Sequence, residues 1–121
     1  MAWKTIRLEL ARTDAFPEGS SSRGYQLHLP VRPNGLIDER AFTAARDRAI
    51  AFRFSPEERD LNGHVIRTAK GWAISYEPGE DDDQGVFHLE SHPLMPGNYL
   101  TLTGYDGSSS PYRIASVEPL A

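Results

Sequence analysis

The last third of the chain alternates between strand-like segments and turns, and this pattern limits the possible folds more than any other. The segments are Val86–Ser91, Asn98–Tyr105 and Tyr112–Val117. Each is rich in aromatic, β-branched or Leu residues, the composition that strands favour. Pro, Gly, Asp and Ser residues separate them, and these residues reverse the direction of a chain. The pattern predicts a β-meander.

Earlier parts of the chain also alternate between apolar and polar residues, a period that indicates half-buried strands. These segments are Trp3–Leu10, Tyr25–Val31, Ile50–Phe54, His64–Ala69 and Trp72–Glu77. Ala11–Gly24 contains Pro, Gly and a run of Ser, which predicts a long loop. Strands at this spacing predict a mainly β fold, a small antiparallel β-barrel or sandwich of about seven or eight short strands.

One segment, Glu39–Arg48, has a helical composition, with three alanines and neither Gly nor Pro. Asp38 stands before it as a suitable N-cap, because its carboxylate can accept a hydrogen bond from the first turn. The alternation resumes at Ile50. We therefore predict one short helix, followed directly by a strand.

The strand periodicity also predicts which side chains form the core. In Ile50–Phe54 the larger apolar residues, Phe52 and Phe54, are expected to face inward, and Ala51 and Arg53 outward. The full predicted core consists of Ile6, Leu8, Leu27, Leu29, Phe52, Phe54, Ile74, Phe87, Leu89, Leu100 and Leu102. On this assignment, Phe52→Ala or Phe87→Ala would each cost roughly 3–5 kcal/mol.

Length and composition add general constraints. The 121 residues fit one domain, residues 1–121. Cysteine is absent, which excludes disulfides and thiolate chemistry within this sequence. The first residues lack the apolar run of a signal peptide, and no stretch is long and apolar enough to span a membrane. These features predict a cytoplasmic protein.

The net charge of −4 is unevenly distributed. Residues 1–70 hold 12 Lys and Arg against 9 Asp and Glu, whereas residues 71–121 hold 1 against 8. A protein that neutralises many phosphates needs clustered basic residues. We therefore expect no nucleic-acid partner and no membrane partner. The partner is expected to be a protein or a small molecule of unknown identity, and the oligomeric state is not predicted.

Two segments contain residue types that bind ions. His88, Glu90 and His92 could ligate a metal. However, the two histidines would lie about 13 Å apart on a continuous strand, so no metal site is predicted. The acidic run Glu80–Asp83 lacks the alternating acidic residues of a calcium loop and reads as a solvated loop.

Arg23 follows a Gly-Ser tract whose backbone N–H groups could hold a phosphate. Phosphate loops usually lead into a helix N-terminus, whereas this tract leads into a predicted strand. The sequence therefore favours a connecting loop over a phosphate site.

The segment Pro96–Leu102, followed by Pro111–Ser116, is similar to the flavin-binding barrel of ferredoxin-reductase-like enzymes. That family has a Pro-Gly-Gln-aromatic strand and, later, an Arg-x-Tyr-Ser/Thr strand that holds the flavin phosphate. The resemblance covers about the last 25 residues. Ser110 stands where that family has its phosphate-binding Arg, and Arg113 and Ile114 follow Tyr112 in place of the hydroxyl residue. Because the motif is incomplete, we predict no flavin and no other cofactor, and the purified protein is expected to be colourless.

No nucleophile motif occurs in the sequence, and no catalytic residue is predicted. The favoured function is a non-catalytic binding or protein-interaction domain. The alternative is a ligand-binding barrel or a small enzyme with a pocket in the barrel mouth, lined by Trp72, Tyr76, Tyr99 or Tyr112. The candidate binding residues are Arg23, Trp72, Tyr76, His88, Glu90, Tyr99 and Arg113.

Overall fold

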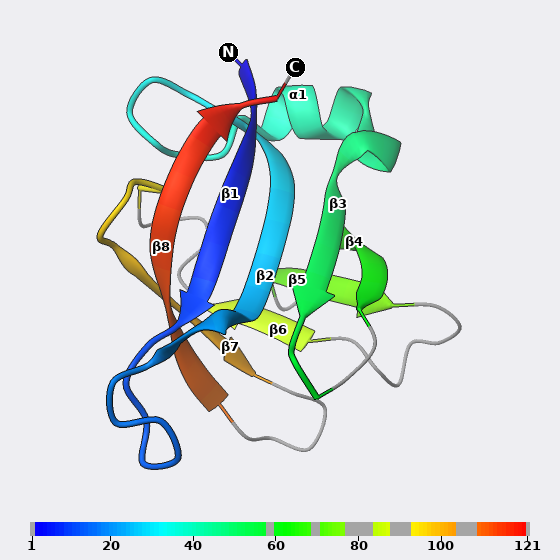
Figure 1. Ribbon diagram of the computed structural model, residues 1–121. Helices are drawn as coiled ribbons and strands as arrows, with labels where there is room; N and C mark the ends of the chain where they lie inside the picture. The colour runs from blue at the N-terminus through cyan, green and yellow to red at the C-terminus, as the bar shows by residue number, and fades with distance from the viewer. Residues whose placement is uncertain are drawn as a thin grey trace.

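The computed structural model describes residues 2–57, 60–68, 71–76, 84–87, 93–103 and 109–120, with only the backbone of residues 2, 61, 76 and 84–87. Within these residues, eight antiparallel strands form a closed barrel in chain order (Figure 1). They are β1 (Ala2–Leu10), β2 (Ser20–Val31), β3 (Ile50–Phe54), β4 (Leu61–Thr68), β5 (Gly71–Tyr76), β6 (Gln84–Phe87), β7 (Tyr99–Thr103) and β8 (Ser109–Pro119). The mainly β prediction is confirmed, with the barrel as its form.

Closure of the barrel depends on β1, which pairs with β2 along one edge and with β8 along the other. Among the described residues, every strand pairs with a neighbouring strand on each side. The β1–β2 register shifts between Glu9 and Leu10. Strand β2 begins at Ser20, so the predicted loop Ala11–Gly24 was too long, and its Ser tract belongs to the strand.

The predicted helix is present in two parts. Helix α1 (Glu39–Ala44) begins after Asp38, whose carboxylate accepts a hydrogen bond from the Ala41 amide at 3.1 Å. It ends at Ala45, where φ is −147°, and a 3₁₀ helix covers Arg46–Arg48. The prediction of a continuous helix to Arg48 was therefore wrong in its last turn. No helix in the described part of the chain is long and apolar enough to cross a membrane.

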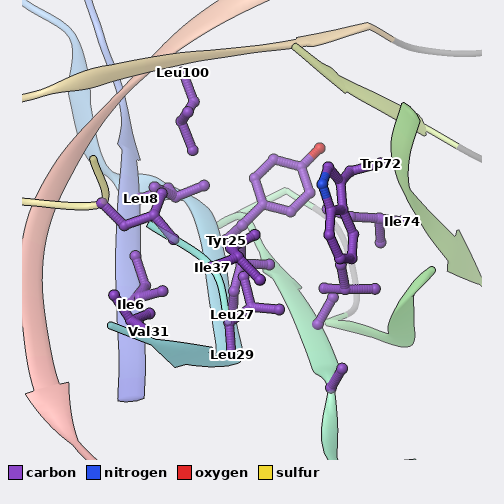
Figure 2. Close-up of a cluster of buried hydrophobic side chains, with 14 of the residues drawn as sticks. Ile6, Leu8, Tyr25, Leu27, Leu29, Val31, Ile37, Trp72, Ile74 and Leu100 are labelled. Atoms are coloured by element: carbon purple, nitrogen blue, oxygen red, sulfur yellow. The ribbon is translucent and has the colours of Figure 1, made fainter. Parts of the chain in front are cut away.

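Apolar side chains from several strands fill the barrel interior (Figure 2). Seven residues of the predicted core are buried, namely Ile6, Leu8, Leu27, Leu29, Ile74, Leu100 and Leu102. Leu89 and the side chain of Phe87 lie outside the described residues. At the barrel end that carries α1 and both termini (Figure 1), Phe42 from α1 is also buried. Leu94, which precedes β7, is buried as well.

The predicted faces of β3 were inverted. Ala51 is fully buried, whereas the Phe52 side chain is 37% exposed. Phe54 is half-buried and lies beneath the guanidinium of Arg7 at 4.5 Å, on the outer wall. The physical reason lies in the pairing with β2, where Ala51 opposes the buried Leu27. Residues directly opposite each other in an antiparallel pair share a face.

This arrangement predicts opposite responses on the two faces of β3. Phe52→Ala should change the free energy of unfolding by less than about 1 kcal/mol, because the side chain is already partly in water. Ala51→Leu should cost about 1–3 kcal/mol through overpacking of the interior. Urea unfolding of both variants measures the difference. If Phe52→Ala lost more stability than Ala51→Leu, the assignment of the β3 faces from the sequence would be correct instead.

Candidate functional site

Three of the four aromatic residues predicted to line a barrel mouth have described side chains, and these three lie in different surroundings. Trp72 is 4% exposed and packs edge-on against Phe42, with ring centroids 4.8 Å apart. Tyr112 packs edge-on against Tyr25 at 5.1 Å. Trp72 and Tyr112 therefore belong to the core or its edge. Tyr99 lies apart from them and is 57% exposed on the outer wall.

Burial affects the polar atoms of these aromatic side chains. Burial raises the pKa of Tyr112 above its usual value of 10.0, Tyr25 raises it further, and Arg53 opposes the shift. Tyr112 therefore remains a neutral phenol at physiological pH and cannot act as a base there. The indole N–H of Trp72 is buried, and no described residue accepts a hydrogen bond from it. Figure 2 shows Tyr25 and Trp72 extending into the filled interior.

The Arg23 side chain makes three contacts with neighbouring residues. Its guanidinium donates a hydrogen bond to the Ser20 hydroxyl at 3.0 Å and forms an ion pair with Glu57. It also stacks over the Phe16 ring at 4.2 Å. These contacts hold the β1–β2 connection against the segment after β3, so Arg23 has a structural role in this arrangement.

The remaining candidates from the sequence are described only in part. His88, Glu90 and the acidic run Glu80–Asp83 lie outside the described residues, as does the side chain of Tyr76. Among the residues that are described, no group of three or more His, Asp or Glu is arranged to hold a metal ion.

Tyr99 and Arg113 do come together, on the outer wall. They are register partners on β7 and β8, and they border a polar depression of about 530 Å³. Glu9 lies between two arginines there, 2.8 Å from Arg7 and 3.7 Å from Arg113. The other lining residues are Leu10, Ala11, Arg12, Glu18, Gly19, Ser20 and Ser21. Acidic and basic groups alternate in this depression, so it presents no single charge to a ligand.

A second depression, of about 460 Å³, lies at the barrel end where β1 begins and β8 ends, and we call it the barrel-end pocket. Most of its surface is apolar. Its lining consists of Lys4, Val31, Arg32, Pro33, Gly35, Leu94, Met95, Pro96 and Val117. Leu94 is buried in the core, whereas Met95 is 42% exposed at the rim.

One wall of the pocket is the turn after β2. The Gly35 amide donates to the Arg32 carbonyl at 2.8 Å, and the Arg32 amide donates to Leu36 at 2.8 Å. Gly35 has a φ of +87°, which favours glycine, and a Cβ there would come within 2.8 Å of the Pro93 side chain. This close approach lets the turn contact the opposite wall.

The opposite wall is the segment that enters β7. The Leu94 amide donates to the Gly35 carbonyl at 2.7 Å, which joins the two walls. The Asn98 side-chain amide donates to the Pro93 carbonyl at 2.8 Å, and the Gly97 amide donates to Ile114 on β8 at 2.9 Å. Backbone and side-chain hydrogen bonds therefore fix both walls before any ligand arrives.

The pocket carries a single sign of charge. Lys4 and Arg32 are its ionisable lining residues, and no carboxylate is found among the described residues of the lining. Neither cation takes part in an ion pair with another described residue. By contrast, Arg7, Arg67 and Arg113 on other parts of the surface each lie within 4 Å of a glutamate.

Sequence reasoning missed this pocket because its lining comes from β1, β2, β8 and two connecting segments that meet only when the barrel closes. One usable signal was present. Lys4 follows the same alternation as Ile6 and Leu8. This alternation places a cation on the inward face of β1, near the start of the strand.

Comparison with known proteins gives no family for this chain: no family model, no curated protein and no solved structure matches it.

Proposed function

We propose that this protein is a non-catalytic binding module that holds the apolar part of a small molecule in the barrel-end pocket. The observation that carries the proposal is the pocket itself, an apolar depression of about 460 Å³ with hydrogen-bonded walls. Small-molecule sites typically have volumes of about 300–1,000 Å³, an apolar lining and a few polar groups.

The filled interior supports placing the ligand at the end of the barrel. Eight-stranded barrels either pack their interior with side chains or enclose one small ligand. Here Leu27, Leu29, Ile74 and Ile114 are fully buried between the strands. A ligand therefore contacts the barrel where the strands end, and Leu94 separates the pocket from the core.

The lining also supports binding over catalysis. The groups that ionise there, Lys4 and Arg32, are cations, and the other described lining residues are apolar or glycine. Acid–base or nucleophilic catalysis commonly needs a positioned base beside the reacting group. A small-molecule partner is also favoured over nucleic acid, because Arg7, Arg23 and Arg67 are already paired with glutamates.

Fluorescence of the neutral apolar dye N-phenylnaphthylamine tests the proposal, since its emission rises when it leaves water. We expect saturable binding to the parent protein and roughly tenfold or greater weakening by Met95→Glu, because a charged side chain would replace apolar surface that the dye contacts at the rim. Phe52→Glu is the matched control. It places the same charge on another exposed apolar position, 37% against 42% exposed, away from the pocket.

The control should bind the dye as the parent does, and thermal melts should show both variants folded. Equal loss of binding in the two variants would contradict a site at the barrel end. The absence of saturable dye binding by the parent protein would contradict the proposal itself.

A further inference from the structure

We infer that the ligand of the barrel-end pocket is an amphipathic carboxylate, with its alkyl chain in the apolar depression and its head between Lys4 and Arg32. This inference rests on the proposed function and adds the charge of the ligand to it. The two features that carry it are the apolar lining and the two cations that border it.

The cations are positioned at the pocket by different elements. Lys4 lies on β1, opposite Leu29 of β2 and Pro119 of β8, and its side chain is half-buried. Arg32 is the first residue after β2, and its backbone is fixed by hydrogen bonds to Leu36 and Gly35. One cation thus sits on the barrel wall and the other on the turn that forms the rim.

The electrostatic setting favours an anion at this place. The chain as a whole carries a net charge of −4, yet the described lining of the pocket contains two cations and no carboxylate. Lys4 has no carboxylate partner among the described residues, so an anion that arrives with the ligand can pair with its half-buried ammonium. A guanidinium can also hold both oxygens of a carboxylate at once.

The apolar lining favours an alkyl chain as the part of the ligand beyond its carboxylate head. Val31, Leu94 and Val117 lie below the rim formed by Met95 and the neighbouring prolines. Each methylene that moves from water into such a surface contributes about 0.8 kcal/mol. An alkyl chain therefore supplies most of the affinity, and the head group selects among ligands with the same chain.

Isothermal titration calorimetry with three ligands that share a ten-carbon chain tests the inference directly: decanoate, decanol and decyltrimethylammonium, all below their aggregation concentrations. We expect decanoate to bind roughly tenfold or more tightly than decanol, and the cationic ligand to bind most weakly. Higher salt should narrow the difference between decanoate and decanol, because salt screens a partly exposed ion pair.

Two variants locate the effect. Lys4→Gln and Arg32→Gln should each reduce the preference for decanoate over decanol, and the double variant should abolish it. Arg12→Gln is the control, since Arg12 is an arginine at the other depression. It should leave the preference unchanged.

The results of these experiments distinguish the proposed binding function from the inferred preference for a carboxylate. Equal binding of decanoate and decanol by the parent protein, with the dye still bound, would overturn the carboxylate inference and leave the proposed function standing. Failure of both the dye and the alkyl ligands to bind would overturn both. A preference for decanoate that survives the double variant would also overturn the inference, because the selecting charge would then lie elsewhere.

Discussion

Replacing Gly24 by alanine is expected to destabilise the barrel by roughly 3 kcal/mol or more, among the largest effects of any single methyl group added to this chain. Gly24 is buried in β2 opposite Glu9, beside the register shift between β1 and β2. An added Cβ would overlap the Leu8 carbonyl oxygen and lie 2.9 Å from its carbon and 3.1 Å from the Glu9 Cα. These are backbone atoms, so no side-chain rotation relieves the contact.

Chemical unfolding of Gly24→Ala measures this effect, and Gly97→Ala is its control. Gly97 has a φ of +95°, but an added Cβ there meets nothing within 4 Å. The control should therefore lose only the strain of a left-handed conformation, about 1–2 kcal/mol. Equal losses in the two variants would mean that the close approach of β1 and β2 at Gly24 is not as described.

Trp72→Ala is expected to cost about 3–5 kcal/mol, the range for removing a buried tryptophan side chain. Trp72 is 4% exposed, packs edge-on against Phe42 of α1, and lies under the Arg67 guanidinium at 5.0 Å. Its loss would leave a cavity in the core and remove the surface on which α1 rests. Helix signal in circular dichroism should weaken together with stability.

Trp72→Phe separates packing from hydrogen bonding at the same position. The indole N–H has no acceptor among the described residues, so its removal should break no hydrogen bond and should relieve a buried donor. A phenyl ring also keeps an aromatic contact with Phe42. We expect this variant to lose less than about half of the stability that the alanine variant loses. Equal losses, measured by urea unfolding, would show that the N–H makes a stabilising bond.

The fold was largely predictable, because the alternation of apolar and polar residues within one strand indicates which side chains face the barrel interior. Alternation located the strands β1 and β5, and Asp38 marked the start of α1. The faces of β3 were not predictable in this way, since Ile50–Phe54 offers apolar residues on both sides. Pairing decides the faces there. Ala51 opposes Leu27 in a filled interior, and the larger Phe52 ring lies outside.

The candidate site was less predictable than the fold, for a related reason. Trp72 and Tyr112 carry the aromatic surface that suggests a pocket, but closure of the barrel turns both into packed side chains. The barrel-end pocket depends instead on how two turns meet. The hydrogen bond from the Leu94 amide to the Gly35 carbonyl joins residues 59 positions apart, and no local sequence pattern predicts such a contact.

The most direct test of a ligand site at the barrel end is a backbone amide NMR titration of the parent protein with decanoate. We expect the largest shifts at the amides of Arg32, Gly35, Leu94 and Val117, and no shifts at the amides around Tyr99 on the outer wall. Shifts centred on the polar depression at Tyr99 and Arg113, or no saturable shifts at all, would contradict a ligand site at the barrel end.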